Sequence, residues 1–467
     1  MSQDYAAFVA QKLATSPPTG FEPPKANRLK GGLFPFQADL VRWALKRGRA
    51  AIFAGTGLGK TRMQLAWAHH VHKHTGRPVL VLAPLAVAQQ TVAEARAVGV
   101  RASLARDQEE VKVGITVTNY DRLHRFVPDT FGAVVLDESS CIKHHDTKTL
   151  ATLLGAFKTT PFKLCCTATP APNDWVELGT HAEFLGVCTR AEMLAEFFFH
   201  DGGETQKWTL KGHARAPFWR WVAAWGALVA HPRDLGHPMD GYDLPPLHVH
   251  EHRVRLSVEA AEAAGFLFPQ EAASLMERRQ ARRASVSDRV EQCARVVREA
   301  EEPWIVWCDL NSEAEELTAA IPGAVEVRGT MDADEKEARL VAFSEGRTRV
   351  LVTKPSIAGF GLNWQHCARV AFVGVTDSWE SYYQAVRRCW RFGQARAVHV
   401  HVFASEAEGA VVANLKRKDA AGAEMARLLA DETAAAVRAE VAGLIREVNE
   451  YAPTRGMEVP AWLTTEA

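Results

Sequence analysis

The sequence AGTGLGKT at residues 54–61 combines residue types that can hold phosphate groups. It fits the phosphate-loop pattern, with Ala54 where the strict form has glycine, and it lies between an apolar run and a helical pattern. Lys60 can reach the β- and γ-phosphates of a nucleotide such as ATP, and Thr61 can hold Mg2+. The predicted nucleotide-binding residues of the loop are Gly55, Thr56, Gly57, Leu58, Gly59, Lys60 and Thr61. The alternative is a glycine-rich turn that binds nothing.

Two adjacent acids, Asp137 and Glu138, end the apolar run AVVLDE at 133–138. At the carboxyl end of a buried strand, one carboxylate can orient Mg2+ and the next can polarise an attacking water molecule. We therefore predict Asp137 as a metal-site residue together with Thr61, and Glu138 as the catalytic base. Adjacent acids can also form a solvated turn, and the preceding phosphate loop favours the catalytic interpretation.

The elements that position these residues alternate between strands and helices. Apolar runs that predict strands in the first half of the chain lie at 50–54, 78–84, 115–120, 133–138 and 163–169. Strands that alternate with crossover helices form a parallel sheet that is covered on both faces. Because the same rhythm returns from residue 304 onward, the sequence predicts an α/β fold with two parallel-sheet lobes.

This rhythm divides the chain into five regions. We expect a lead-in at 1–32, a nucleotide-binding lobe at 33–180, a helical insertion and linker at 181–300, a second lobe at 301–405 and a helical tail at 406–467. The lead-in is rich in proline and glycine, the insertion is rich in tryptophan, and the tail is rich in Ala, Glu and Arg.

The composition narrows the class of protein. The 467 residues carry 55 basic and 55 acidic side chains, so any nucleic-acid contact must come from a local patch. The eight cysteines form no C-x-x-C pair, which favours buried reduced thiols over a zinc site. The amino terminus has no basic export signal, and no apolar run reaches the length of a membrane span. We therefore expect a cytoplasmic protein with no membrane partner.

Further motifs, in order along most of the chain, resemble helicase superfamily 2 and within it the Swi/Snf-type translocases. The matching segments are LFPFQADLVRWAL at 33–45, VLAPLAVAQQTVAEA at 81–95, CTATPAPNDWVEL at 166–178, YDLPPL at 242–247, IAGFGLNWQHCARVAF at 357–372 and QAVRRCWRFGQ at 384–394. The resemblance implies two RecA-like lobes with ATP and Mg2+ bound between them. The compact chain is similar to helicases of bacterial viruses and prophages, which implies a bacterial or phage-infected host cytoplasm.

The resemblance also implies roles for individual residues. Gln37 takes the position that reads the adenine base, Gly361 a nucleotide contact, and Arg388 and Arg391 the two arginine-finger positions. Residues implied to couple hydrolysis to movement or to contact DNA are Pro84, Asn119, Thr167, Thr169, Asn363 and Gln384. Arginines from the second lobe would stabilise transition-state charge only when the lobes close. ATP hydrolysis would therefore depend on a motion of one lobe relative to the other. The alternative for the two arginines is a basic, solvated helix face.

The sequence departs from the family pattern at four positions. Ser139 and Ser140 replace the Ala-His of a DEAH box, Arg387 replaces a glycine, and Trp390 replaces a histidine. The two serines remove the histidine through which the family couples this motif to the next one. Phosphate, metal and water contacts do not use that histidine, so the predicted ATPase chemistry is unaffected.

Two basic stretches could track a nucleic-acid backbone. Residues 205–225 interleave basic side chains with four tryptophans, and MERRQARR at 276–283 contains four arginines. Core packing is the competing interpretation for the tryptophans, and a solvated helix is the competing interpretation for the arginines. Four histidines between His69 and His74 lack an H-E-x-x-H pattern, and we do not expect a metal site there.

The sequence thus predicts an ATP-dependent translocase that binds MgATP and acts as a monomer on double-stranded DNA. One alternative is an RNA or single-strand helicase of the same superfamily. Another is a nucleotide-gated recruitment subunit, whose partner nuclease or replication or recombination protein the sequence does not identify.

Overall fold

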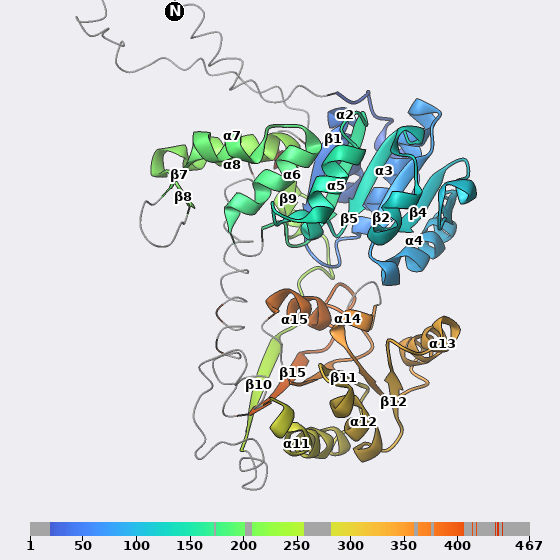
Figure 1. The fold of residues 1–467 in the computed structure, drawn as a ribbon, viewed down its shortest axis with the longest axis vertical. Coiled ribbons are helices and arrows are strands. Elements are labelled where there is room, and N and C mark those ends of the chain that lie inside the picture. Colours follow the sequence, from blue (N-terminus) through green and yellow to red (C-terminus); the bar gives the residue numbers. More distant parts are fainter. Residues whose placement is uncertain are drawn as a thin grey trace, which may run out of the picture.

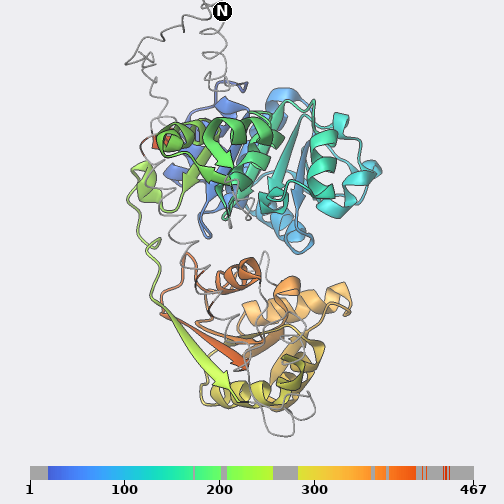
Figure 2. The ribbon, with the colours of Figure 1, turned by 60° about the vertical axis from the view of Figure 1, so that its left-hand side comes forward.

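The computed structural model describes residues 19–171, 174–200, 208–255, 282–358, 363–374 and 378–405, with single helical positions at 413, 417, 435, 437, 438 and 441. The described chain forms two α/β lobes, which Figure 1 and Figure 2 show one above the other. Each lobe is built on its own parallel sheet. The predicted fold class is therefore confirmed.

The first sheet has the order β3-β4-β2-β5-β6-β1-β9. Its strands are β1 (Arg49–Ala54), β2 (Val79–Ala83), β3 (Ala102–Leu104), β4 (Ile115–Asn119), β5 (Ala133–Asp137), β6 (Phe162–Thr167) and β9 (Gly226–Val229). The central strands are buried along almost their whole length, because helices cover both faces of the sheet.

Alternate residues of β1 enter two different cores. Ile52 packs with the helices on one face, and Phe53 packs with those on the other. The first face carries α2 (Pro35–Arg47), α3 (Lys60–Thr75) and α4 (Leu85–Ala97). The second carries α5 (Lys148–Ala156), α6 (Leu178–Leu185), α7 (Arg190–Phe197) and α8 (Arg215–Trp225). A hairpin of β7 (Phe198–His200) and β8 (Trp208–Leu210) follows α7.

The second sheet has the order β10-β15-β14-β11-β13-β12. Its strands are β10 (Leu247–Val254), β11 (Trp304–Cys308), β12 (Ala324–Val327), β13 (Val350–Thr353), β14 (Arg369–Val373) and β15 (Val398–Ser405). Its helices are α11 (Val286–Arg298), α12 (Asn311–Ala320), α13 (Ala333–Ser344), α14 (Pro355–Ala358) and α15 (Trp379–Val386). Residues of α11 and α12 share one core, and residues of α13 and α15 share the other.

The stretch 181–300, which we expected to be a helical insertion and linker, is divided between the lobes. Strand β9 completes the first sheet, whereas β10 and α11 belong to the second lobe. Strand β10 carries His248, His250 and His252 at alternate positions of an edge strand. A polar edge strand lacks the apolar run that marks a buried strand in the sequence, which explains why the pattern did not reveal it.

Most of the predicted tail lies outside the described residues. Val437 has a helical backbone, and its side chain is 1% exposed and packs into the core beside α2 and α3. Arg438 Nε donates a hydrogen bond of 3.1 Å to the carbonyl oxygen of Asp234. The chain therefore returns to the first lobe after it has completed the second.

Candidate active site between the lobes

The glycine-rich loop connects β1 to α3 in the first lobe. Gly57 and Gly59 have φ angles of 89° and 79°, which residues with a side chain rarely adopt. A Cβ atom on Gly59 would also lie 2.3 Å from Nε2 of Gln37. Position 59 therefore favours glycine both for its backbone conformation and for the close approach of the Gln37 side chain.

The side chain of Gln37 fixes the loop against the start of α2. Its Nε2 donates a 2.9 Å hydrogen bond to the carbonyl oxygen of Leu58, and its Oε1 accepts one of 2.9 Å from the backbone N–H of Phe34. The residue is only 2% exposed. In the structure this amide positions the phosphate loop, and the base-reading role of Gln37 stays a prediction.

The loop presents polar groups that fit phosphate oxygens. Lys60 Nζ donates a 3.0 Å hydrogen bond to the carbonyl oxygen of Ala54, so the ammonium group is held beside the loop. Thr56 Oγ1 is buried without a hydrogen-bond partner in the described part of the chain. Thr61 lies in the first turn of α3, where backbone N–H groups and the helix dipole favour an anion.

Asp137 and Glu138 follow the apolar residues of β5, as the sequence predicts for the two acids. Gln64, one turn after Lys60 on α3, donates a 2.6 Å hydrogen bond from Nε2 to Asp137 Oδ1. Burial and the neighbouring Glu138 raise the pKa of Asp137 to about 6. A divalent cation would offset both effects, so the carboxylate is suited to a metal site.

Glu138 has a strained backbone and a defined side-chain contact. Its φ of 51° is the only positive φ of a non-glycine residue in the described ranges. Thr167, at the end of the neighbouring strand β6, donates a 3.3 Å hydrogen bond from Oγ1 to Glu138 Oε2. The backbone N–H of Thr169 donates to the same hydroxyl at 3.1 Å. The structure thus joins the predicted base to the two predicted coupling threonines.

The segment after Glu138 has a histidine neighbour that the sequence motif did not reveal. Ser139 Oγ lies 3.1 Å from Nε2 of His181 on α6. Burial lowers the pKa of His181 to about 4, so the ring is neutral at physiological pH. A histidine therefore contacts this segment, although the residue comes from another helix and not from the DEAH position.

Arg388 from the second lobe lies in the electrostatic field of the two acids of the first. Burial, reinforced by the nearby Arg391, lowers its pKa to about 10, while Glu138 and Asp137 oppose that shift. The residue is 5% exposed. Arg388 Nε lies 3.3 Å from the carbonyl oxygen of Gln384, and Arg388 Nη2 lies 3.4 Å from Gln384 Oε1. Gln384 is also buried. The alternative of a solvated face is therefore wrong for Arg388.

Arg391 lies over the phosphate loop. A Cβ atom built on Gly57 would be 3.7 Å from Arg391 Cβ and 3.1 Å from the backbone nitrogen of Phe392. Burial lowers the pKa of Arg391, and Glu94 opposes that shift. Its Nε is buried without a hydrogen-bond partner among the described residues. A buried guanidinium donor without a partner beside a phosphate loop fits an anionic ligand.

Aromatic residues that the sequence motifs did not single out close the site. The rings of Tyr242 and Phe392 lie 4.4 Å apart, and Phe34 makes edge contacts with both. A small cavity of about 180 Å3 is lined by both lobes, including Thr56, Tyr242 and Arg387. Arg387 stacks 4.2 Å from the ring of Trp390, so two departures from the family pattern contact each other.

The remaining predicted residues are spread over the surrounding loops. Pro84 precedes the first turn of α4, and Asn119 Oδ1 accepts a 3.2 Å hydrogen bond from the backbone N–H of Arg122. Asn363 is exposed. Gly361 lies outside the described residues. The Asn119 contact positions a loop, and the predicted DNA contacts of these residues stay predictions.

The two basic stretches differ in their surroundings. Trp219 and Trp225 are 1% and 2% exposed within the core, which confirms core packing for these two tryptophans. Arg282 forms an ion pair of 2.9 Å with Asp309. Arg278 and Arg279 lie outside the described residues.

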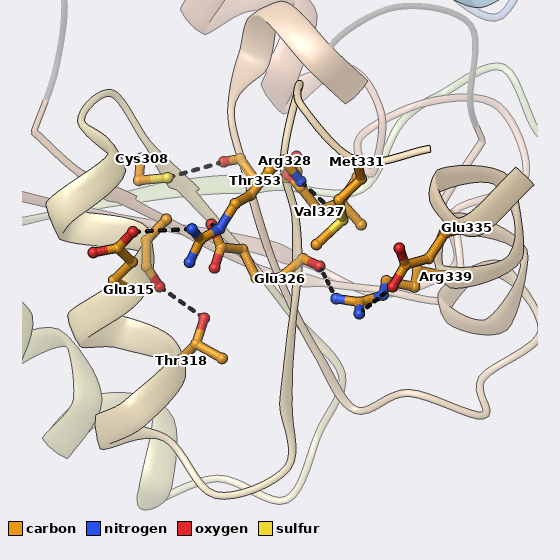
Figure 3. A network of polar contacts seen from close by, with 11 residues as sticks. Cys308, Glu315, Thr318, Glu326, Val327, Arg328, Met331, Glu335, Arg339 and Thr353 are labelled. Carbon is orange, nitrogen blue, oxygen red and sulfur yellow. Dashed lines mark hydrogen bonds and ion pairs between the residues drawn. The ribbon is translucent and has the colours of Figure 1, made fainter. Parts of the chain in front are cut away.

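A larger cavity of about 690 Å3 opens beside the edge strand β12, and no predicted site residue is among the described residues that line it. Figure 3 shows that its arginines are already paired. Arg328 forms ion pairs with Glu315 and Glu326, and Arg339 pairs with Glu335. The two lining arginines are therefore engaged by carboxylates and are poorly suited to bind an anionic substrate.

None of the helices in the described part of the chain has the length and apolar character needed to cross a bilayer. In the same part, no three metal-ligating side chains of His, Cys, Asp or Glu converge.

Comparisons with known proteins identify two helicase domains in the regions that carry the motifs. The family model described as DEAD/DEAH box helicase matches residues 34–177, and the model described as helicase conserved C-terminal domain matches residues 288–393. No curated protein matches the chain. Among solved structures, the chain is similar to the SWI2/SNF2 ATPase core of Sulfolobus solfataricus in complex with dsDNA, with 18% identity and a TM-score of 0.43. That match covers 90% of this chain and 99% of the other.

The two family models meet at the site described above. The first contains the phosphate loop, the acid pair, Thr167 and Thr169, and the second contains Arg388 and Arg391. Because both family models and the motifs agree, the chain belongs to helicase superfamily 2 and is a nucleic-acid-dependent ATPase.

Proposed function

We propose that this ATPase hydrolyses MgATP between its two lobes and uses the cycle to move along double-stranded DNA. The observation that carries the proposal is the position of Arg388, a buried second-lobe cation that experiences the field of Asp137 and Glu138 in the first lobe. An arginine in this position can act on the phosphoryl group only when both lobes surround it.

Each residue of the site has a proposed task. The backbone of the phosphate loop and Lys60 hold the β- and γ-phosphates, while Thr61 and Asp137 hold the cation. Magnesium, when bound, would neutralise charge that develops on the phosphate oxygens. Glu138 orients the attacking water and accepts its proton, and Thr167 fixes the carboxylate for that task. Arg388 and Arg391 stabilise the charge of the transition state.

The same geometry supports coupling of chemistry to motion. The first lobe alone supplies no arginine from the predicted finger positions to the γ-phosphate side, so turnover requires the second lobe to approach. Thr167 and Thr169 link the catalytic base to the loop after β6. Movement of that loop would therefore be transmitted to Glu138, which makes hydrolysis sensitive to nucleic acid held across the lobes.

The nucleic acid along which the protein moves is proposed to be duplex DNA. Its support is the sequence resemblance to Swi/Snf-type translocases, above all YDLPPL at 242–247 and QAVRRCWRFGQ at 384–394. The balanced net charge implies a local phosphate track and not a general polycation. We expect contacts to the backbone, with little dependence on base sequence, and a chain that acts as a monomer.

The test is the ATPase rate with duplex DNA, single-stranded DNA and RNA of equal length, each at two salt concentrations. The proposal predicts the largest stimulation by duplex DNA, the same for two unrelated sequences, and affinity that falls steeply with salt. Replacing Arg278, Arg279, Arg282 and Arg283 together would reduce the salt dependence if that run contacts DNA. Stimulation by RNA equal to or above that by duplex DNA would contradict the substrate assignment.

A further inference from the structure

Glu380 joins the lobes at a point that none of the matched motifs explains. The residue lies in the first turn of α15 in the second lobe. Oε1 accepts a 3.0 Å hydrogen bond from Ser140 Oγ of the first lobe, and Oε2 forms an ion pair with Lys143, also of the first lobe. Both carboxylate oxygens are therefore engaged by the opposite lobe.

On the first lobe, the contact falls directly beside the catalytic acids. Ser140 belongs to the short 3-10 turn Ser139–Ile142 that follows Glu138, and it occupies the position of the DEAH histidine. The preceding residues are fixed within their own lobe by the Ser139–His181 contact and by the hydrogen bond from Thr167 to Glu138. A force on Ser140 therefore acts on a short, anchored segment that carries the proposed base.

On the second lobe, the contact falls on the helix that leads to the arginines. Trp379, Ala385 and Val386 of α15 are buried in the core, so the helix is fixed to its lobe. Gln384 lies on the same helix, and Arg388 follows shortly after its end and contacts Gln384. The orientation of α15 therefore determines where Arg388 meets the first lobe.

We propose that Glu380 is a positioning residue, a latch that aligns α15 and the arginines that follow it with the segment after Glu138. The latch comprises Glu380, Ser140 and Lys143. In this chain it supplies the interlobe connection at the position where the DEAH histidine is missing. The inference rests on the proposed hydrolysis between the lobes and adds a residue that touches neither ATP nor the reacting atoms.

The burial of the latch suits a contact that forms and breaks. The side chains of Lys143 and Glu380 are 15% and 27% exposed, so the pair is partly shielded from water without being locked in a dry core. A partly shielded pair of opposite charges favours one alignment of two surfaces and disfavours others. Such a pair can align the lobes in the closed state and still release them when the lobes part.

The test uses the full-length chain with saturating nucleic acid and measures kcat and KM for ATP separately. Glu380→Gln and Lys143→Met should each lower kcat about tenfold with little change in KM, because fewer molecules reach the aligned closed state. The exchange variant Lys143→Glu with Glu380→Lys restores opposite charges in reversed order. It should recover most of the lost kcat, which a purely structural role of either residue would not produce.

A matched control is Glu335→Gln, which removes an ion pair with Arg339 on the same lobe but away from the interface. Its kcat should equal that of the unaltered chain. The latch is refuted if Glu380→Gln leaves kcat unchanged, or if the exchange variant is no better than the single variants. Thermal unfolding midpoints of all variants would show whether any loss of kcat comes from a loss of stability.

A second measurement separates the latch from the proposed function. Small-angle X-ray scattering of the nucleotide-free chain reports the distance between the lobes without any turnover. Glu380→Gln should increase the radius of gyration, and the exchange variant should reverse the increase. Absence of ATPase in the unaltered chain would contradict the proposed function, whereas scattering that does not change with Glu380→Gln would contradict the latch.

Discussion

The hydroxyl of Thr167 donates a hydrogen bond of 3.3 Å to Oε2 of Glu138 and accepts one from the backbone N–H of Thr169. One side chain thus connects the proposed catalytic base to the loop that follows β6. Glu138 also has a left-handed backbone, with φ of 51°, a conformation that persists only where surrounding contacts hold it.

Replacing Thr167 with Val should lower kcat by about 10-fold to 100-fold, the range expected when a carboxylate loses one oriented hydrogen bond. Thr167→Ser keeps the hydroxyl and should retain most of the activity. Steady-state ATPase with saturating nucleic acid measures both. Equal rates for the Val and Ser variants would show that the hydroxyl does not orient the base.

Glu138→Gln should retain nucleotide binding and lose hydrolysis. The amide can still hydrogen-bond a water molecule, but it cannot accept the proton that leaves during attack. Binding of a fluorescent ATP analogue and single-turnover hydrolysis measure the two properties on the same sample. Turnover at the unaltered rate would mean that the catalytic base lies elsewhere.

Gly59→Ala should abolish ATP binding at ordinary concentrations and lower the unfolding midpoint. The added Cβ would meet the Gln37 amide at 2.3 Å in a backbone conformation with φ of 79°. Gly76→Ala is the matched control, since Gly76 has φ of 68° but no atom within 4 Å of where its Cβ would lie. It should cost about 1 kcal/mol of stability and leave ATP binding intact. Similar ATP affinities for the two variants would contradict this explanation of the loop.

The stability of the second lobe should fall as the pH falls below about 6.5. His401 is 8% exposed, and its Nδ1 lies 3.0 Å from Nε2 of His252. Burial, with His250 and His252, lowers the pKa of His401 to about 3. In the unfolded chain the His401 ring takes up a proton near pH 6.5, whereas in the folded chain the same ring stays neutral. Protonation therefore favours unfolding as the pH falls from about 6.5 toward 3.

The measurement is the thermal unfolding midpoint between about pH 7.5 and pH 5, which spans the ordinary pKa of histidine. The midpoint should decrease toward the acid end of this range, and His401→Gln should make the decrease smaller. His145→Gln, at an exposed position, serves as the control and should not alter the slope. A midpoint that rises on acidification would reverse the predicted sign.

Much of the site could be predicted from sequence because its motifs act locally. The phosphate loop needs glycine, lysine and threonine at fixed spacing, and the acid pair ends an apolar strand, so both are visible without tertiary information. Strands that are buried on both faces were equally visible. The edge strand β10 was not, because its alternating histidines lack the apolar run of a central strand.

Contacts between distant segments left no such pattern. Gln64 could have been inferred from its position one turn after Lys60 on α3, but its contact with Asp137 depends on how the helix crosses the sheet. His181 and Glu380 reach Ser139 and Ser140 from separate elements. Their roles follow only from the tertiary arrangement, since no fixed spacing along the chain relates them to the acid pair.

The most direct test of catalysis between the lobes is kcat for Arg388→Ala with saturating duplex DNA. Because Arg388 acts on transition-state charge from the second lobe, kcat should fall by about 1,000-fold or more while the affinity for ATP changes little. An unfolding midpoint close to that of the unaltered chain would confirm that the variant is folded. An unchanged kcat in the folded variant would contradict the proposal that the second lobe completes the active site.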